Sequence, residues 1–275
     1  MFKQCFSGFH AFSRVLGSVL LSATLALGGC GLLPDLKDET SGWSAQKLYA
    51  TAKDELNDGN YERAVKLFET LEARYPFGRY AQQAQLDIAY AYYKDNEAIS
   101  AIAACDRFIK LHPNHPNVDY AYYLKGLANF NDDLGILGNL VDQNMGERDP
   151  VASRDAFLSF KELVTRFPDS KYAEDATARM KFLVNTMAEH EIYVAKYYLK
   201  REAWVAAANR ATAVVKTYPN TPAMEQALAI MVVAYDKLQR PELSKDAQRI
   251  LLLNFPNSKY ATGVSLDGKA WYRFW

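Results

Sequence analysis

One corner motif recurs along the sequence and constrains its fold more than any other feature. Phe167-Pro168-Asp169-Ser170-Lys171-Tyr172-Ala173 returns almost letter for letter as Phe255-Pro256-Asn257-Ser258-Lys259-Tyr260-Ala261, and looser copies stand at Tyr75-Pro76, His112-Pro113 and Tyr218-Pro219. Proline cannot continue the helix that it follows, and Ser170, Thr221 or Ser258 can accept a hydrogen bond from the free amides of the next helix. Each copy therefore predicts where one helical pair ends and another begins.

The spacing of these corners predicts a repeat architecture. The corner prolines are 37, 55, 51 and 37 residues apart, which is close to the 34-residue tetratricopeptide period with two insertions. Strand signals are almost absent from Ala45 onward, while apolar residues recur at every third and fourth position. Counting back from Pro76 places Ala52, Ala64 and Phe68 at the small and bulky positions of that repeat. We predict an all-α protein, an α-solenoid of five tetratricopeptide-like helix pairs with a C-terminal capping helix.

The two long intervals between corners locate the insertions. We predict repeats 1 and 2 over residues 45–116, repeat 3 over 117–168 with an inserted loop at 131–149, and repeats 4 and 5 with the cap over 169–275. Gly126 is the small residue of repeat 3, and Cys105 falls on a core position of repeat 2, which predicts a packed, unreactive thiol. Tyr172 to Tyr198 is long enough for a helix of about seven turns. The aromatic tail Trp271 to Trp275 is expected to cover the end of the array.

The first thirty residues have the layout of an export signal. Lys3 and Arg14 are the only charges before an apolar run that ends at Leu27, and this run is too short to span a bilayer. Leu27-Gly28-Gly29-Cys30 looks like a bacterial lipobox, with Gly31 favouring the inner leaflet of the outer membrane. We predict a signal peptide over 1–29, lipidation of Cys30 and a tether over 30–44. The alternative is ordinary signal cleavage near Gly29 with Cys30 as an incidental thiol.

The composition and motifs argue against several function classes. Lys+Arg equals Asp+Glu at 32 each, whereas nucleic-acid binders usually show a basic excess. His112 and His115 have no third metal ligand near them in sequence, so we predict no metal site. The sequence has no Gly-x-Ser-x-Gly, P-loop or dinucleotide-binding motif. We predict no catalytic residues, no enzyme activity and no cofactor.

The first helix of each repeat is expected to line the inner face of the solenoid. Residues one, four, eight and eleven places after each repeat start point there. Tyrosine offers a large contact area with a polar end, so this face favours an extended, aromatic-bearing peptide. The alternative is that several tyrosines pack between helices, with Tyr92 and Tyr122 as the clearest core candidates. The inner-face set is Gln46, Tyr49, Lys53 and Leu56 in repeat 1, Gln83, Leu86, Tyr90 and Tyr93 in repeat 2, and Tyr120, Tyr123, Leu127 and Phe130 in repeat 3.

Six segments resemble the BamD family, the essential lipoproteins of the β-barrel assembly machine. The resemblance extends from about Tyr49 to Leu253 and includes exposed turn residues that the tetratricopeptide period does not require. The segments are Arg74-Tyr75-Pro76-Phe77-Gly78, Gln82-Gln83-Ala84-Gln85-Leu86-Asp87, Tyr90-Ala91-Tyr92-Tyr93-Lys94, His115-Pro116-Asn117-Val118-Asp119-Tyr120, Arg148-Asp149-Pro150 and Ala203-Trp204-Val205-Ala206-Ala207-Ala208-Asn209-Arg210.

The resemblance implies a periplasmic scaffold with two working halves, lipid-anchored in the outer membrane. The N-terminal half would bind the aromatic-ended targeting segments of unfolded outer-membrane β-barrel proteins. The C-terminal half would contact the periplasmic domains of the barrel subunit BamA through Trp204 and Arg210, and BamC would pack along the same molecule. The expected substrate-binding residues are Tyr49, Tyr75, Phe77, Tyr80, Tyr90, Tyr93, Tyr120 and Tyr123. The alternative function is a periplasmic tetratricopeptide coordinator of envelope constriction and peptidoglycan synthesis.

Overall fold

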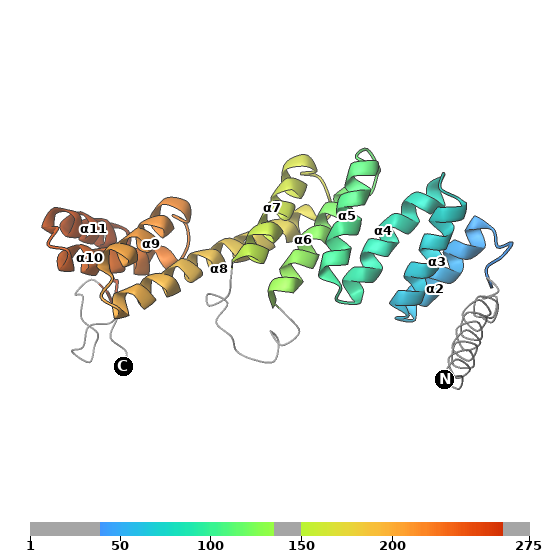
Figure 1. Cartoon of the computed structure of the whole chain (residues 1–275). Helices are drawn as coiled ribbons and strands as arrows, with labels where there is room; N and C mark the ends of the chain where they lie inside the picture. The colour runs from blue at the N-terminus through green and yellow to red at the C-terminus, as the bar shows by residue number, and fades with distance from the viewer. Residues whose placement is uncertain (1–38, 135–149, 261–275) are drawn as a thin grey trace, which may run out of the picture. The chain divides into compact units, whose positions relative to one another are not determined.

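The computed structural model describes residues 39–134 and 150–260. The chain divides into two compact units, residues 1–43 and 44–275, and the helices considered below all belong to the second. The described residues form ten α-helices and no strand, which confirms the predicted all-α class (Figure 1). The helices are α2 (Ala45–Asn57), α3 (Tyr61–Arg74), α4 (Arg79–Lys94), α5 (Ala98–Leu111), α6 (Val118–Leu134), α7 (Val151–Arg166), α8 (Ala173–Lys200), α9 (Trp204–Thr217), α10 (Ala223–Lys237) and α11 (Pro241–Asn254).

The helices form five consecutive antiparallel pairs, beginning with α2 and α3 and ending with α10 and α11. Each helix packs against the next one along the chain. The first helices of neighbouring pairs are also in contact, for example α2 with α4 and α4 with α6. This is the predicted solenoid of five tetratricopeptide-like pairs. The capping helix predicted from Ser258 and the aromatic tail lie beyond Tyr260, outside the described residues. Helix α6 runs to Leu134, into the predicted insertion, and the remainder of that insertion is likewise outside them.

The five corners share one backbone geometry. The residue before each corner proline ends its helix with φ between −133° and −128° and ψ between 50° and 70°. Its amide N–H donates to the carbonyl four residues earlier, at 2.8 Å in every copy. Because a following proline disfavours the α conformation, this residue leaves the helical region while keeping the last helical hydrogen bond. The residues are Tyr75, His112, Phe167, Tyr218 and Phe255.

The hydroxyl groups after the prolines do not all act as predicted. Ser170 Oγ accepts from the amide of Tyr172, the residue before α8, and Ser258 Oγ from that of Tyr260, each at 3.2 Å, and the helix expected after Ser258 lies outside the described residues. Thr221 differs, since its Oγ1 donates back to the Tyr218 carbonyl at 2.8 Å. Thr221 is buried, and a buried hydroxyl donor needs a partner within reach. The prediction that Thr221 accepts from the next helix is therefore wrong.

Small residues set how closely the paired helices approach. Twelve residues before the corner proline, four of the five repeats bury an alanine, and in the fifth Ser244 is half-buried. Gly126 is the predicted small residue of α6, and a Cβ atom there would overlap the ring of Phe160 on α7, 2.6 Å from Cδ1. Cys105 is buried as predicted, and burial raises the pKa of its thiol to about 12. The alanines are Ala64, Ala101, Ala156 and Ala207.

Helix α8 joins two hydrophobic clusters. The first cluster, which reaches back to Leu86 and Phe108, ends on α8 at Leu183. The second begins on α8 at Ala188 and continues through α9, α10 and α11. With 28 residues, α8 has the length predicted for the repeat-4 insertion. The described solenoid thus has an N-terminal half, α2 to α7, and a C-terminal half, α9 to α11, with α8 shared between them.

Candidate functional site

The first corner differs from the others after its proline. Tyr75 is 38% exposed and Phe77 is 92% exposed, the highest value among the large hydrophobic side chains described. Gly78 precedes α4 with φ 106°, in the region that side chains with a Cβ rarely adopt, so glycine is required there for conformation. No serine or threonine caps α4. This corner therefore presents an aromatic ring to solvent, whereas Ser170 and Thr221 of later corners make hydrogen bonds within their own turns.

Tyr49 and Tyr80 lie together at the inner edge of repeats 1 and 2. Their ring centroids are 5.4 Å apart, and Tyr49 Oη donates to Asp87 Oδ2 at 2.8 Å. Asp87 is the only buried charged residue described, at 7% exposure, and also receives Lys53 Nζ at 3.3 Å and Gln83 Nε2 at 3.4 Å. Burial and then this carboxylate raise the pKa of Tyr49. Asp87 thus ties α2 to α4 and fixes the orientation of Tyr49.

A second aromatic group spans repeats 3 and 4. Tyr123 stacks on Tyr172 with centroids 4.7 Å apart and an interplanar angle of 15°, while Tyr120 lies 5.4 Å from the same ring. Tyr123 Oη donates to Asp175 Oδ2 at 2.7 Å, and Arg179 Nε donates to the same oxygen at 2.6 Å. Burial raises the pKa of Tyr120, with Tyr90 and Tyr172 adding to the effect. Tyr90 on α4 thus affects the pKa of Tyr120 on α6, the next first helix.

The structure brings six of the predicted substrate-binding tyrosines into two groups, with a pair between them, and not into one uniform row. Tyr49 joins Tyr80 in the first, and Tyr120 joins Tyr123 in the second. Tyr90 and Tyr93 lie between them on α4, with ring centroids 6.5 Å apart. All six are half-buried, so each exposes part of its surface while packing on a neighbour.

Some inner-face assignments need correction. Leu56 and Leu86 were assigned to the inner face but are buried, Leu86 within the cluster that includes Phe108 and Val118. Tyr122 is a core residue as predicted, at 4% exposure. Tyr92 is only half-buried and lines a pocket between α3 and α4, so its prediction as a core residue is wrong. Tyr172 and Asp175 were not predicted as site residues, although Tyr172 belongs to the repeated Ser-Lys-Tyr-Ala corner and could have been singled out by it.

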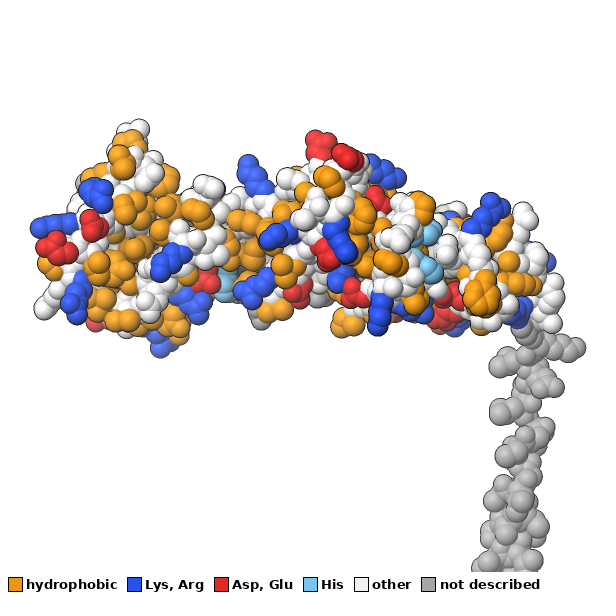
Figure 2. All heavy atoms as spheres, turned by 90° about the horizontal axis from the view of Figure 1, so that it is seen from above, with side chains coloured by type: hydrophobic (Ala, Val, Ile, Leu, Met, Phe, Trp, Pro, Cys, Tyr) orange, Lys and Arg blue, Asp and Glu red, His pale blue; other side chains and the backbone are white. Residues whose placement is uncertain are grey.

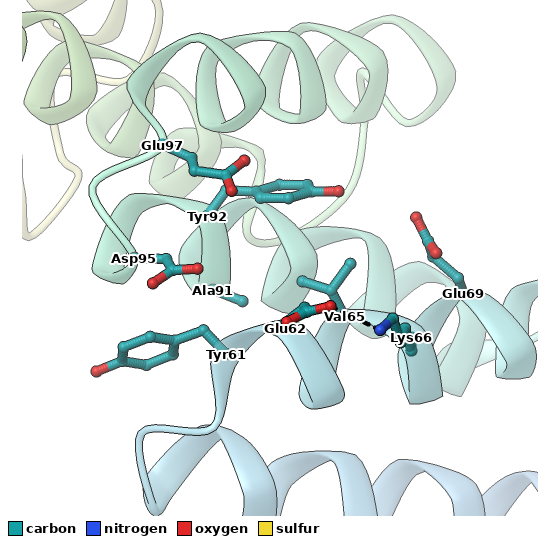
Figure 3. Close-up of a pocket in the computed structure, with 9 residues that line it drawn as sticks. All are labelled: Tyr61, Glu62, Val65, Lys66, Glu69, Ala91, Tyr92, Asp95 and Glu97. Atoms are coloured by element: carbon teal, nitrogen blue, oxygen red, sulfur yellow. Dashed lines mark hydrogen bonds and ion pairs between the residues drawn. The ribbon is translucent and has the colours of Figure 1, made fainter.

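The pocket beside Tyr92 has an acidic lining. It encloses about 290 Å³, and Figure 3 shows Tyr61 and Tyr92 on either side of an opening with four carboxylates around it. Lys66 Nζ contacts Glu62 Oε1 at 2.6 Å. Burial raises the pKa of Tyr92, and the charges of Glu69 and Glu97 raise it further. The pocket lies between two helices of successive repeats, a juxtaposition that local sequence does not reveal. The four carboxylates are Glu62, Glu69, Asp95 and Glu97.

The two predicted partner-binding residues have different environments. Trp204 begins α9 and is half-buried against the C-terminal cluster. Arg210 is exposed, and its Nη1 lies 3.1 Å from Glu191 Oε2 on α8. Arg210 stands nine residues before its corner proline, where the other four repeats bury Leu67, Ala104, Ser159 and Ala247. An arginine at a position otherwise used for packing points to a surface role.

The remaining predictions concern a metal site, a membrane span and the lipidated cysteine. The His112 and His115 rings are 6.4 Å apart, and both lie against Phe108. Among the described residues no group of three or more His, Cys, Asp or Glu side chains is arranged to hold a metal ion. Within residues 39–134 and 150–260, no helix is both long and apolar enough to span a bilayer. Cys30 lies outside the described residues.

Comparisons with known proteins identify the family. The profile of the YfiO family, described as outer membrane lipoprotein, matches residues 42–251. The outer membrane protein assembly factor BamD of Neisseria meningitidis serogroup A / serotype 4A is 51% identical over 259 residues, covering 93% of this chain and 97% of the relative. BamD of Vibrio cholerae serotype O1 is 38% identical over 237 residues, covering 85% of this chain and 97% of that relative.

One solved structure, the tetratricopeptide domain of P58(IPK), aligns with this chain at 16% sequence identity and a TM-score of 0.40. The alignment covers 79% of this chain and 53% of the P58(IPK) chain. The fold assignment rests instead on the helix pairing described above. The family assignment rests on the profile and the relatives, which span nearly the whole chain. The chain belongs to the BamD family of outer-membrane protein assembly factors.

Proposed function

We propose that this protein is a lipid-anchored periplasmic scaffold of the β-barrel assembly machine. Its N-terminal half binds the targeting segments of unfolded outer-membrane β-barrel proteins, and its C-terminal half binds the periplasmic domains of BamA. BamC and other lipoproteins of the complex are further partners. Cys30 carries the lipid that holds the scaffold at the periplasmic leaflet of the outer membrane. The names of the relatives support the general role, and the geometry of the two halves supports this division of labour.

The inner-face tyrosines carry the proposal for the N-terminal half. Their rings are half-exposed across α2, α4 and α6, and two of their hydroxyl groups are held by Asp87 and Asp175. A surface held in place before binding loses less conformational entropy when a peptide docks. Tyrosine also offers apolar area and hydrogen bonding to a segment that carries aromatic side chains. Phe77 at the first corner adds an exposed ring to the same half.

Site-specific crosslinking tests the substrate surface. A photo-crosslinking amino acid at Phe77 or Tyr90 should capture unfolded outer-membrane proteins during their export. The matched control is Ile99 on α5, which is apolar and exposed but absent from the predicted surface. Capture at Ile99 that equals capture at Phe77 and Tyr90 would remove the claim that this surface reads substrate.

Charge reversal tests the partner surface. Arg210→Glu would place a second carboxylate beside Glu191, and we expect recovery of BamA with the purified protein to fall about tenfold or more. Arg249→Glu is the control, because Arg249 is also exposed and pairs with Asp246 on α11 at 3.5 Å. Undiminished recovery of BamA with Arg210→Glu would place the interface elsewhere.

Membrane fractionation tests the anchor. Cys30→Ser should release the protein from the membrane fraction, since the remaining mature chain would have no acyl chains to hold it. Retention of the mature variant in outer membranes would contradict lipidation at Cys30. Affinity purification of the unaltered protein from solubilised outer membranes distinguishes the proposed role from envelope constriction, because the first recovers a barrel-assembly complex and the second recovers proteins of peptidoglycan synthesis.

A further inference from the structure

A row of exposed aromatic side chains follows one face of α8. Phe182, Tyr193 and Tyr197 are 44%, 43% and 47% exposed. Steps of eleven and four residues each come close to whole helical turns, so the three rings share a face along about 22 Å of helix. Helix α8 passes from α6 and α7 to α9 and α10 (Figure 1). Exposed apolar groups gathered in this way mark contact surfaces in soluble proteins.

Positive charges meet at the C-terminal end of this row. The Arg201 guanidinium lies 4.8 Å from the centre of the Tyr197 ring, and Lys259 Nζ lies 5.1 Å from the centre of the Tyr260 ring. Lys196 is half-buried one residue before Tyr197. None of Lys196, Arg201 and Lys259 has a carboxylate partner at ion-pair distance in residues 39–134 and 150–260. By contrast Arg210, on the adjacent helix α9, is paired with Glu191.

The lysines are close enough to affect one another. Burial lowers the pKa of Lys196, and the ammonium groups of Lys259 and Lys200 lower it further, against a weaker opposite effect of Glu189. Tyr260 of the last corner and Tyr198 of α8 pack against the same hydrophobic cluster, which includes Leu199, so two chain segments that are far apart in sequence bring these like charges together. An anion bound among them would favour the charged form of Lys196 and offset its burial.

Helix capping does not account for this arrangement. Cations in the last turn of a helix are favoured by the helix dipole, and this explains Lys200 and Arg201. It does not explain Lys259, which lies in the last corner, or Lys196, which is half-buried a full turn earlier. A second reason is needed for placing these two beside each other.

We propose that the C-terminal end of α8 and the last corner form a docking surface for an acidic segment of a protein partner. Lys196, Arg201 and Lys259 bind its carboxylates, and Tyr197 and Tyr260 contact its apolar groups. The row of rings at Tyr193 and Phe182 gives such a segment a path along α8. A half-buried ammonium such as Lys196 is reached by an inserted side chain and not by a flat bilayer, which favours a protein over anionic lipid. This surface is separate from the contact proposed at Arg210 and does not depend on it.

Peptide binding to the full mature chain tests the proposal. The probe is a fluorescent peptide of repeated Glu-Glu-Leu units, compared with its Gln-Gln-Leu counterpart by fluorescence anisotropy. The acidic peptide should bind more tightly than the neutral one. The triple variant Lys196→Gln, Arg201→Gln, Lys259→Gln should weaken its binding about tenfold or more. Binding to the unaltered protein should also weaken as salt concentration rises.

The matched control changes Lys110, Lys216 and Lys237 to glutamine. Each of these lysines occupies the last turn of its helix, so the control removes the same charge without touching the proposed surface. Equal loss in the control and the test variant would overturn the proposal, as would equal binding of the two peptides. Vesicles containing anionic phospholipid form a separate arm. Binding to vesicles without binding to the acidic peptide would also overturn it, by assigning the surface to lipid.

Discussion

The two halves of the solenoid keep the same period but fill it with side chains of different size. Five residues before the corner proline the N-terminal half buries Leu71, Phe108 and Leu163, and the C-terminal half buries Val214 and Leu251. Eight residues before it, Phe68, Cys105 and Phe160 give way to Ala211 and the exposed Gln248. At these positions the paired helices of the N-terminal half thus enclose larger side chains, including aromatic rings, than the paired helices of the C-terminal half.

The surfaces of the two halves differ in their tyrosines and not in their exposed aliphatic groups. The N-terminal half holds the hydroxyl groups of Tyr49 and Tyr123 with carboxylates, while both halves expose aliphatic side chains on their second helices, α5 and α7 in the first and α9 and α11 in the other. Figure 2 shows hydrophobic side chains gathered over the C-terminal helices. A shared backbone period therefore leaves each half free to place its aromatic side chains differently, in the core or on the inner face. The exposed aliphatic residues of α9 and α11 are Val205, Leu243, Leu252 and Leu253.

The largest expected effect is the loss of stability on truncating equivalent core residues in the two halves. Phe108→Ala should lower the free energy of unfolding by about 3–5 kcal/mol, because it empties a ring-sized cavity in the N-terminal half. Val214→Ala, at the same place in repeat 4, removes far fewer atoms and should cost about 1.5–3 kcal/mol. Urea unfolding followed by circular dichroism measures both. Equal costs would mean that the two halves do not differ in packing as described.

The next effect tests close helix approach in the N-terminal half. Gly126→Ala places a Cβ against the Phe160 ring and should destabilise the protein by about 1–3 kcal/mol. Phe160→Leu shrinks the opposing side chain, so the double variant should lose less than the sum of the two single variants. A thermodynamic cycle from urea unfolding measures this coupling. Additive losses would show that the two positions do not compete for the same space.

A smaller effect compares the two carboxylates that hold the inner-face tyrosines. Asp87→Asn weakens contacts to three donors at a buried site and should cost about 1–3 kcal/mol. Asp175 is exposed, so Asp175→Asn should cost no more than about 1 kcal/mol. Hydrogen exchange should report the loss of Asp87 in α2 and α4, with α10 unaffected. Similar exchange changes in α10 would argue against a local role for Asp87.

The smallest effect is a pH dependence at the second corner. Burial lowers the pKa of His115, and the nearby His112 lowers it further, so the folded state favours the neutral ring. The amide of Asn117 donates to His115 Nδ1 at 3.1 Å, a contact that protonation of Nδ1 removes. The contribution of His115 to folding stability is therefore complete above the ordinary histidine pKa of about 6.5. It is lost as the pH falls through the lowered pKa that His115 has in the folded state.

Urea unfolding at several pH values measures this dependence. His115→Gln should flatten the dependence of stability on pH below about 6.5, because it removes the titrating group. His190→Gln, on α8, is the control and should retain the slope of the unaltered protein. An unchanged slope in His115→Gln would assign the acid sensitivity to other groups.

Much of the fold follows from local sequence rules, but the arrangement of the surfaces does not. The corner prolines predicted the ends of five helices because the clash of a proline ring with the preceding residue is local. Arg210 could also have been marked by counting back from Pro219, since the same count reaches buried residues in the other repeats. Thr221 was misjudged because its buried hydroxyl donates back to the Tyr218 carbonyl and does not cap the next helix.

The helical class, the five repeats, the small residues at helix contacts and the membership of the family all follow from local sequence patterns. Which side chains meet across repeats depends on the folded arrangement. Tyr49 and Asp87 are 38 residues apart and Tyr123 and Asp175 are 52 apart, so no local pattern announces either pair. The meeting of Lys196 with Lys259 depends in the same way on how successive helix pairs stack. Contacts of this kind depend on the rotation between repeats, which arises from the summed packing of many side chains and not from any one motif.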